Sequence, residues 1–224
     1  MHSTPWTAIV PVRAGSKGLP GKNLRLLCGK PLYRHAVDQA LAAGAASVIV
    51  TTDIPDIWSA ELPLGVRVAQ RPPELAGDQT PMAPVVLDCL ERTEVIGPVV
   101  LLQATSPMRR PEHIAAALRL LETQTFDLVM SVTEADRGVL KWGRLEGERF
   151  IPLADPAFCF SNRQSLPAVV KPNGAVYAFD SGWFKRNGSF VTPHIGVIAM
   201  TPQESQDIDT LEDFQRCETA LCGR

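Results

Sequence analysis

The stretch Ala8–Asn23, AIVPVRAGSKGLPGKN, joins a short apolar run to a loop of glycines and cations. The apolar run, Ala8–Val12, has the length and composition of a buried strand. The loop after it contains three glycines and three cations: Gly15, Gly18, Gly21, Arg13, Lys17 and Lys22. Glycines let backbone N–H groups approach an anion closely, and the cations offset the charge of a polyphosphate. The stretch therefore predicts a phosphate-binding loop after the first strand, with a solvated turn as the alternative.

Two common phosphate-binding patterns do not fit this loop. A Walker A loop needs a lysine after its second glycine, but Leu19 follows Gly18. A dinucleotide-binding fingerprint needs the spacing G-x-G-x-x-G, whereas the three glycines of this loop are each three residues apart. We therefore exclude both classes of site.

Apolar strands and amphipathic helices alternate outward from the loop. We expect further strands at 47–52, 66–69, 99–103 and 128–132, and helices beginning at Pro31, Pro81 and Pro111, with Thr80 as the cap before Pro81. Continuous apolar strands separated by helices predict an α/β fold, a Rossmann-like and mostly parallel sheet flanked by helices. Ligands of such sheets bind beyond the carboxyl ends of the strands.

The alternation breaks at approximately residues 134–172, where Gly, Pro, Arg and aromatic residues replace the apolar runs. We interpret this segment as a lobe inserted into a single domain that spans residues 1–224. Strand-like runs return at 175–179 and 195–200, and a last helix is expected over 211–221, with Asp209 or Thr210 as its cap. A hairpin turn at Asn173-Gly174 is one of two interpretations of that pair.

Composition and charge exclude several function classes. The net charge is −2 and charged residues make up 21% of the chain, so no basic field attracts nucleic acid or an anionic membrane. No apolar stretch reaches the roughly 18 residues that a membrane span needs, and the N-terminus lacks the pattern of a signal peptide. The five cysteines are scattered without a C-x-x-C pair, so we expect free thiols, no zinc and a cytoplasmic location.

The loop and five later segments resemble the acylneuraminate cytidylyltransferases. Residues 13–23 are similar to that family's R-x-G-S-K-G-L-P-x-K-N signature. The later segments are RPPELAGD at 71–78, LLQATSPMR at 101–109, RQSLP at 163–167, PNGAVY at 172–177 and DID at 207–209. Ala104 stands where the family usually has proline, which loosens that turn but leaves the polar side chain of Gln103 unchanged. The resemblance implies a nucleotide-diphospho-sugar transferase fold whose small inserted lobe serves dimerisation.

The resemblance also implies that CTP binds at the first loop. The implied nucleotide-binding residues are Arg13, Ala14, Gly15, Ser16, Lys17, Lys22, Asn23, Arg71 and Asp78. Arg13 and Lys22 are expected to contact the triphosphate and to stabilise the transition state. With the pair Asp207 and Asp209 they make up the implied catalytic set. No side chain stands out as a general base.

Asp207 and Asp209 flank Ile208, so in an extended segment their carboxylates face the same side. Two such carboxylates suit Mg²⁺ (or Mn²⁺), which completes its shell with phosphate oxygens and water. The alternative is a cap for the helix at Leu211, because a carboxylate there complements the helix dipole. The resemblance favours metal binding, and Asp209 can do both.

The implied second substrate is an acidic nine-carbon sugar, bound by Gln103, Lys141, Arg163, Asn173 and Tyr177. The alternatives are a structural role for Gln103 at its strand end and ordinary surface exposure for Lys141 and Arg163. A guanidinium can grip a carboxylate with two hydrogen bonds, which supports Arg163. In the family the lobe packs onto a second subunit, so Lys141 and Arg163 are expected to serve the partner's site in a homodimer.

These features predict a CTP-dependent nucleotidyltransferase that activates a sialic acid-type nonulosonic acid to its CMP-sugar and releases pyrophosphate. Alternatives are the same transfer to legionaminic, pseudaminic or ketodeoxyoctonic acid. The last is disfavoured because that related family's loop reads S-T-R-L-P-G-K, where this chain has SKGLPGK at 16–22. A nucleotide-binding protein without activity is the remaining alternative, and the intact pair Asp207 and Asp209 argues against it.

Overall fold

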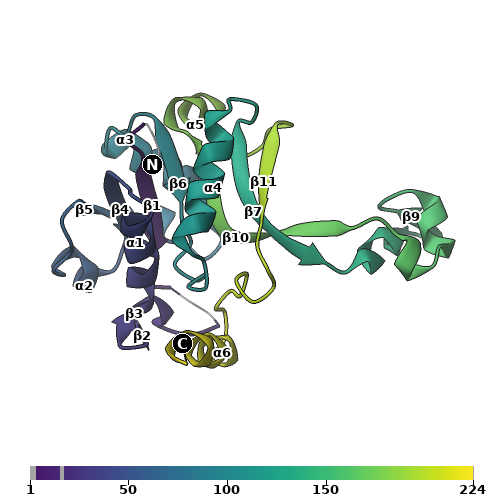
Figure 1. The fold of residues 1–224 in the computed structure, drawn as a ribbon, viewed down its shortest axis with the longest axis horizontal. Coiled ribbons are helices and arrows are strands. Elements are labelled where there is room, and N and C mark those ends of the chain that lie inside the picture. The colour runs from purple at the N-terminus through teal and green to yellow at the C-terminus, as the bar shows by residue number, and fades with distance from the viewer. Residues whose placement is uncertain (1–3, 16–17, 224) are drawn as a thin grey trace.

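A seven-stranded sheet in the order β11-β7-β10-β6-β1-β4-β5 forms the centre of the computed structural model (Figure 1), which describes residues 4–15 and 18–223. Its strands are β1 (Thr7–Val12), β4 (Ser47–Thr52), β5 (Val66–Gln70), β6 (Pro98–Leu101), β7 (Leu128–Ala135), β10 (Val169–Asp180) and β11 (Ile195–Ala199). Parallel pairs join β1 to β4 and β6, β4 to β5, and β7 to β11. Only β10, between β6 and β7, pairs antiparallel in this sheet. The predicted mostly parallel α/β fold is confirmed.

Helices cover both faces of the sheet because neighbouring residues of each strand point to opposite sides. The helices are α1 (Leu32–Ala42), α2 (Pro55–Trp58), α3 (Met82–Arg92), α4 (Pro111–Glu122), α5 (Ser181–Asn187) and α6 (Leu211–Cys222). Val10 packs in the core under α1 and α4, whereas its neighbour Ile9 packs in the core under α3 and α5. Among the described residues, none of the helices has the length and apolarity to cross a membrane.

The predicted helix starts are correct to within one residue. Helix α4 begins at Pro111 as expected, and α6 begins at Leu211 with Thr210 as its cap. Pro81 is itself the cap of α3, so the expectation that Thr80 holds this place is wrong. The reason is local: Pro81 has an extended backbone with a ψ of 152°, and the helix starts only at Met82. Pro31 precedes α1 in the same way.

Strand β10 differs most from the sequence-based prediction. It runs unbroken through Asn173-Gly174, so the hairpin interpretation of this pair is wrong. The pairing with β7 shifts register between Pro172 and Tyr177, and Gly174 has a φ of +77°. Glycine reaches that backbone conformation without steric cost, so the turn signal marks a bulge inside a strand. The short helices α2 and α5 were not predicted.

Beyond the sheet, β7 and β10 continue side by side as a ribbon that carries residues 136–168 away from the body of the molecule (Figure 1). This lobe contains the hairpin β8 (Gly143–Glu146) and β9 (Arg149–Pro152) and three short 3-10 turns. Large apolar side chains are exposed on it: Trp142, Leu145, Phe150, Leu153 and Phe160. An isolated monomer rarely exposes so many apolar side chains in one small segment.

The C-terminal helix packs against the start of the chain. Leu19, Leu27 and Leu32 form a buried cluster with Ile208 and Phe214. Nearby, the hairpin of β2 (Leu26–Leu27) and β3 (Lys30–Pro31) is joined to the end of α6 by a disulfide between Cys28 and Cys222. The expectation of free thiols is therefore wrong for this pair, because the fold brings together residues that are 194 positions apart. The other three cysteines are free.

Candidate active site

A cavity of about 220 Å³ opens at the carboxyl ends of β1 and β6. Its lining comes from the first loop, the loop after β6 and the segment before α6: Pro11, Arg13, Gly15, Lys22, Asn23, Arg71, Met82, Gln103, Ala104, Thr105, Asp207 and Asp209. Parallel strands place their following loops at one edge, which explains why residues so far apart in sequence meet here. The cavity combines cations with a carboxylate pair, a set that can hold a phosphate chain and a metal ion.

Side chains from other elements hold the first loop in place. The carboxylate of Asp53, just after β4, accepts a hydrogen bond of 2.8 Å from the backbone N–H of Ala14. Arg13 forms an ion pair with Asp78, and the amide of Asn23 donates to the carbonyl of Arg13 at 3.0 Å. Asn23 is buried and its Oδ1 atom has no partner among the described residues. Ala14, Asn23 and Asp78 thus shape the loop around the cavity, and Ser16 and Lys17 lie outside the described residues.

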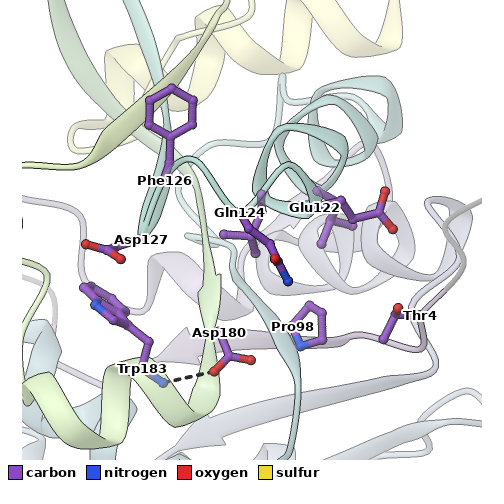
Figure 2. Close-up of a pocket in the computed structure, with 10 residues that line it drawn as sticks. Thr4, Pro98, Glu122, Gln124, Phe126, Asp127, Asp180 and Trp183 are labelled. Atoms are coloured by element: carbon purple, nitrogen blue, oxygen red, sulfur yellow. Dashed lines mark hydrogen bonds between the residues drawn. The ribbon is translucent and has the colours of Figure 1, made fainter.

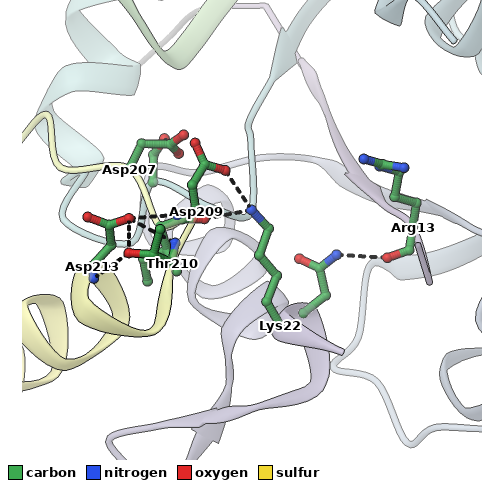
Figure 3. Close-up of polar contacts among 9 residues, drawn as sticks. Arg13, Lys22, Asp207, Asp209, Thr210 and Asp213 are labelled. Atoms are coloured by element: carbon green, nitrogen blue, oxygen red, sulfur yellow. Dashed lines mark hydrogen bonds and ion pairs between the residues drawn. The ribbon is translucent and has the colours of Figure 1, made fainter. Parts of the chain in front are cut away.

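Lys22 connects the first loop to the carboxylate pair, as Figure 3 shows. Its ammonium group donates to the carbonyl oxygen of Ile208 at 2.6 Å and to Asp209 Oδ1 at 3.0 Å. Gly18 approaches the same segment so closely that a Cβ atom there would lie 2.3 Å from the carbonyl oxygen of Asp209. The loop and the carboxylate pair therefore form one unit, although nearly 190 residues separate them in sequence.

Asp207 lies in an environment that penalises its negative charge. Asp207 is exposed at its surface, but the protein atoms around its carboxylate remove part of its water shell and so raise the pKa of Asp207, and the neighbouring charge of Asp209 raises it further. Hydrogen bonds from Thr105 and Ser106 oppose the shift, with Ser106 Oγ 3.4 Å from Asp207 Oδ1. A bound cation would relieve this penalty. Among the described residues, no group of three or more His, Cys, Asp or Glu side chains is arranged to hold a metal ion. Mg²⁺, however, needs only one or two carboxylates besides phosphate oxygens. The pair fits such an ion.

Arg71 lies between this cavity and a neighbouring hollow of about 700 Å³ next to Trp58 and Pro72. Its side chain is buried and donates to the carbonyl of Thr51 at 2.8 Å. Burial lowers the pKa of Arg71, and the charge of Asp53 partly offsets the effect. Arg71 thus lines both hollows, while Asp78, at the other end of the segment 71–78, pairs with Arg13.

Comparison with known proteins identifies the family. Residues 7–181 match the family described as Cytidylyltransferase. The chain belongs to the cytidylyltransferase family. The match covers the sheet from β1 to the end of β10 and includes the first loop and Gln103.

Several curated members of this family are similar to the chain. An N-acylneuraminate cytidylyltransferase of Streptococcus agalactiae serotype V is 34% identical over 92% of this chain, which spans about half (51%) of that protein. A CMP-N,N'-diacetyllegionaminic acid synthase of Legionella pneumophila is 33% identical over 96% of this chain and 95% of its own length. Among solved structures, a CMP:2-keto-3-deoxy-manno-octonic acid synthetase complexed with CTP has a TM-score of 0.74 and 18% identity, covering 98% of this chain and 99% of its own. This last likeness concerns the fold.

In this cytidylyltransferase fold, the five residues expected to bind the sugar do not all meet. Gln103 lines the cavity. Burial raises the pKa of Tyr177, and the charge of the nearby Asp207 raises it further. The amide of Asn173 is engaged by Ser131, by Ser205 at 2.8 Å and by the backbone N–H of Ala175 at 3.2 Å, so it holds the bulge of β10.

Lys141 and Arg163 lie in the lobe, and neither lines the cavity of their own chain. Lys141 donates to the carbonyl of Ser161, and Arg163 forms an exposed ion pair of 2.8 Å with Asp136. Within one chain, the structure therefore does not bring them to the other predicted site residues.

Another cavity, of about 660 Å³, lies at the opposite ends of the strands, beside Pro98 and Asp127 at the starts of β6 and β7 (Figure 2). Among the described residues, its lining includes the carboxylates Glu122, Asp127 and Asp180 and no Lys or Arg. A triphosphate would meet only like charge there, so this cavity is unsuited to the nucleotide.

Three residues that shape the site were not assigned a role from sequence: Asp53, Ser106 and Arg109. The sequence marks Asp53 as a polar candidate because it follows the buried strand β4 at its carboxyl end, but it indicates no role for the residue. Ser106 and Arg109 lie within the quoted segment 101–109, but their partners Asp207 and Ala175 are distant in sequence. Only the fold reveals those contacts.

Proposed function

We propose that this chain is a CTP-dependent cytidylyltransferase that forms the CMP-sugar of a sialic acid-type nonulosonic acid and releases pyrophosphate. The observation that carries the proposal is the cavity in which the Lys22 ammonium group meets the Asp209 carboxylate, beside Arg13 and Asp207. Family membership and the curated relatives support the choice of nucleotide and sugar class.

In the proposed reaction, the anomeric hydroxyl of the sugar attacks the α-phosphorus of CTP. The bond between the α-phosphorus and the bridging oxygen breaks, pyrophosphate carries this oxygen away, and the proton of the sugar hydroxyl passes to solvent water. Arg13 and Lys22 stabilise the charge that develops on the phosphate oxygens. Gln103 orients the sugar by hydrogen bonds from its neutral amide. Catalysis of this kind depends on positioning and electrostatics.

Asp207 and Asp209 would hold a Mg²⁺ ion, which supplies positive charge to the phosphate oxygens when it is bound. The raised pKa of Asp207 supports this role because a cation would offset the cost of keeping that carboxylate ionised. Lys22 contacts Asp209 and Ser106 contacts Asp207, so both carboxylates are held in place before any ion binds.

A second candidate is the same transfer to N,N'-diacetyllegionaminic acid. The Legionella relative supports it, because its match extends over 95% of that protein, whereas the N-acylneuraminate relatives are matched over about half of their length. Both sugars are acidic, so the charges of the cavity do not separate them.

We also propose that two copies form a homodimer through the lobe. Its exposed apolar side chains, Leu145 and Phe160 among them, support a role as a contact surface. In such a dimer, the lobe of one subunit would bring its Lys141 and Arg163 to the cavity of the other subunit. These two residues do not line the cavity of their own chain. We also propose a cytoplasmic location, which subcellular fractionation tests.

The deciding experiment measures Mg²⁺-dependent pyrophosphate release with CTP, ATP, GTP and UTP against sialic, legionaminic, pseudaminic and ketodeoxyoctonic acids. We expect turnover with CTP and one nine-carbon acid, and loss of turnover in Asp207→Asn/Asp209→Asn. CTP binding without turnover for every acid would replace this proposal with a nucleotide-binding role.

A further inference from the structure

Arg109 is a cation buried inside the wall of the candidate site. Only 1% of its surface is exposed, and it lies in the loop between β6 and α4. Within residues 4–15 and 18–223, no carboxylate forms an ion pair with it. Burial lowers the pKa of Arg109 to about 9, so the guanidinium stays charged at neutral pH. A buried charge without a counter-charge is costly and calls for an explanation.

The hydrogen bonds of Arg109 satisfy only part of its side chain. Its Nη1 atom donates to the carbonyl of Gln103 at 3.2 Å and to the carbonyl of Ala175 at 2.6 Å. Its Nε and Nη2 atoms are buried and have no partner among the described residues. The guanidinium is therefore held in one place by two backbone carbonyls while most of its donors and its charge remain uncompensated.

One of the two carbonyls belongs to a residue that lines the candidate site, and the other lies in the buried core beside it. Gln103 lines the cavity, and Ala175 lies in the bulge of β10 that Asn173 stabilises. The charge of Arg109 thus lies one hydrogen bond behind the backbone of Gln103. Inside a protein a charge acts on its neighbours more strongly than it does across water.

We propose that Arg109 is a positioning residue for the acidic sugar, and that its uncompensated charge draws the sugar carboxylate to the Gln103 end of the cavity. The inference rests on the proposed function, because it concerns the second substrate of that reaction. The guanidinium does not touch the substrate. It acts through the electrostatic attraction of its positive charge and by fixing the carbonyls of Gln103 and Ala175 in place.

The test compares the free acid with its neutral methyl ester. For wild type, Arg109→Met and Arg109→Lys, we would measure KM for CTP, KM for the acid and the inhibition constant of the ester. Arg119→Met is the matched control, since Arg119 lies exposed on the adjacent helix α4. In Arg109→Met we expect KM for the acid to rise about tenfold, because one charge interaction is lost. KM for CTP and the inhibition constant of the ester should stay within about twofold of wild type. Arg109→Lys, which keeps the charge, should retain most of the preference for the acid.

Other outcomes would overturn the inference. If Arg109→Met raises KM for the acid, KM for CTP and the inhibition constant of the ester by the same factor, the role of Arg109 is structural. If all three constants stay unchanged, the proposal is overturned as well. If Arg109→Met does not fold, Arg109→Gln replaces it, because Gln can still donate to both carbonyls but carries no charge. Wild-type protein that binds CTP but turns over no acidic sugar would refute the proposed function first. A wild-type enzyme whose Arg109 variants keep the acid preference refutes only this inference.

Discussion

At the scale of single residues, the site depends on contacts between the first loop and the segment 207–209. Lys22 and Gly18 both reach this segment, one through hydrogen bonds and the other through close backbone approach. A small displacement of either partner would therefore change the distance between the cations and the carboxylates. Two predictions follow from the packing and the charges at this point.

Replacing Gly18 with alanine should impair CTP use. The new Cβ atom would lie 2.3 Å from the carbonyl oxygen of Asp209, so the loop or the segment 207–209 must move. Because misplacement by about 1 Å can cost about 100-fold in rate, we expect kcat/KM for CTP to fall by roughly that factor. Gly44→Ala is the control. Gly44 has a φ of +87°, which alanine adopts only with strain, so the substitution should lower the melting temperature, but Gly44 lies away from the site. Equal kinetic effects in both variants would contradict the prediction.

Asp207→Asn should make the metal-free protein more stable at pH 7 and abolish turnover. The folded pKa of Asp207 is raised, so the folded state holds its proton more tightly than the unfolded state does. Stability therefore falls as pH rises through the window between the two pKa values, and the penalty is complete above it. Asn removes this penalty, so the gain in melting temperature should shrink when thermal unfolding is repeated at pH 4.

Asp209→Asn provides the comparison for this measurement. Asp209 is paired with Lys22, so its replacement removes a favourable contact and should give no gain in stability. A gain of equal size in both variants would mean that the loss of water around the Asp207 carboxylate is not the cause.

The residue types of the site could be predicted from sequence, but their roles only in part. Arg13, Lys22, Gln103 and the two aspartates were expected, and the structure gathers them around one cavity. Asn173 was expected to bind the sugar, yet its amide is used by Ser131 and Ser205. These hydrogen bonds join Asn173 to residues that are dozens of positions away, so the local sequence does not indicate them.

At the scale of secondary structure elements, helix α6 links stability to the site. It begins two residues after Asp209 with a capping box, in which Thr210 and Asp213 exchange hydrogen bonds with each other's backbone N–H groups. Hydrogen bonds from Thr210, together with Arg216, lower the pKa of Asp213 to about 2, so the carboxylate stays ionised throughout the neutral range.

Thr210→Ala should lower the free energy of unfolding by about 1 kcal/mol, the usual cost of losing an N-cap. For a domain of this size, that corresponds to a fall of about 2–4 °C in melting temperature. Thr210→Ser keeps the hydroxyl oxygen and should stay near wild type. The pair can be compared by calorimetry or circular dichroism, and equal loss in both variants would show that the methyl group of Thr210, and not its hydroxyl, stabilises the helix.

The buried strands and the helices α1, α3 and α4 were the elements that sequence predicted well. The apolar runs at β1, β4 and β6 are continuous because both faces of these strands are covered. Strand β10 was harder, since its outer half, 169–174, is largely exposed and contains Pro172 and Gly174 where it leaves the sheet with β7. The sequence of its inner half predicts a separate strand, and no local sequence pattern indicates that the two halves form one strand.

At the scale of the whole molecule, the lobe should control assembly. Phe160 and Leu145 are 92% and 76% exposed on it, which suits a surface that a second copy covers. We expect Phe160→Ser/Leu145→Ser to convert a dimer to a monomer in size-exclusion chromatography with light scattering. Ile96→Ser is the control, because Ile96 is 89% exposed but lies on the body of the molecule, just before β6. A wild-type monomer, or a dimer that survives the double change, would refute the assembly proposal.

The disulfide between Cys28 and Cys222 makes nearly the whole chain a closed covalent ring. A protease that cuts once within the protruding lobe would therefore open the ring without releasing a fragment. The two pieces, one with β1 to β7 and the other with β10 to α6, would run as one band on a non-reducing gel and as two bands after reduction. Oxidised protein nicked in this way should keep both halves of its site on a single covalent molecule.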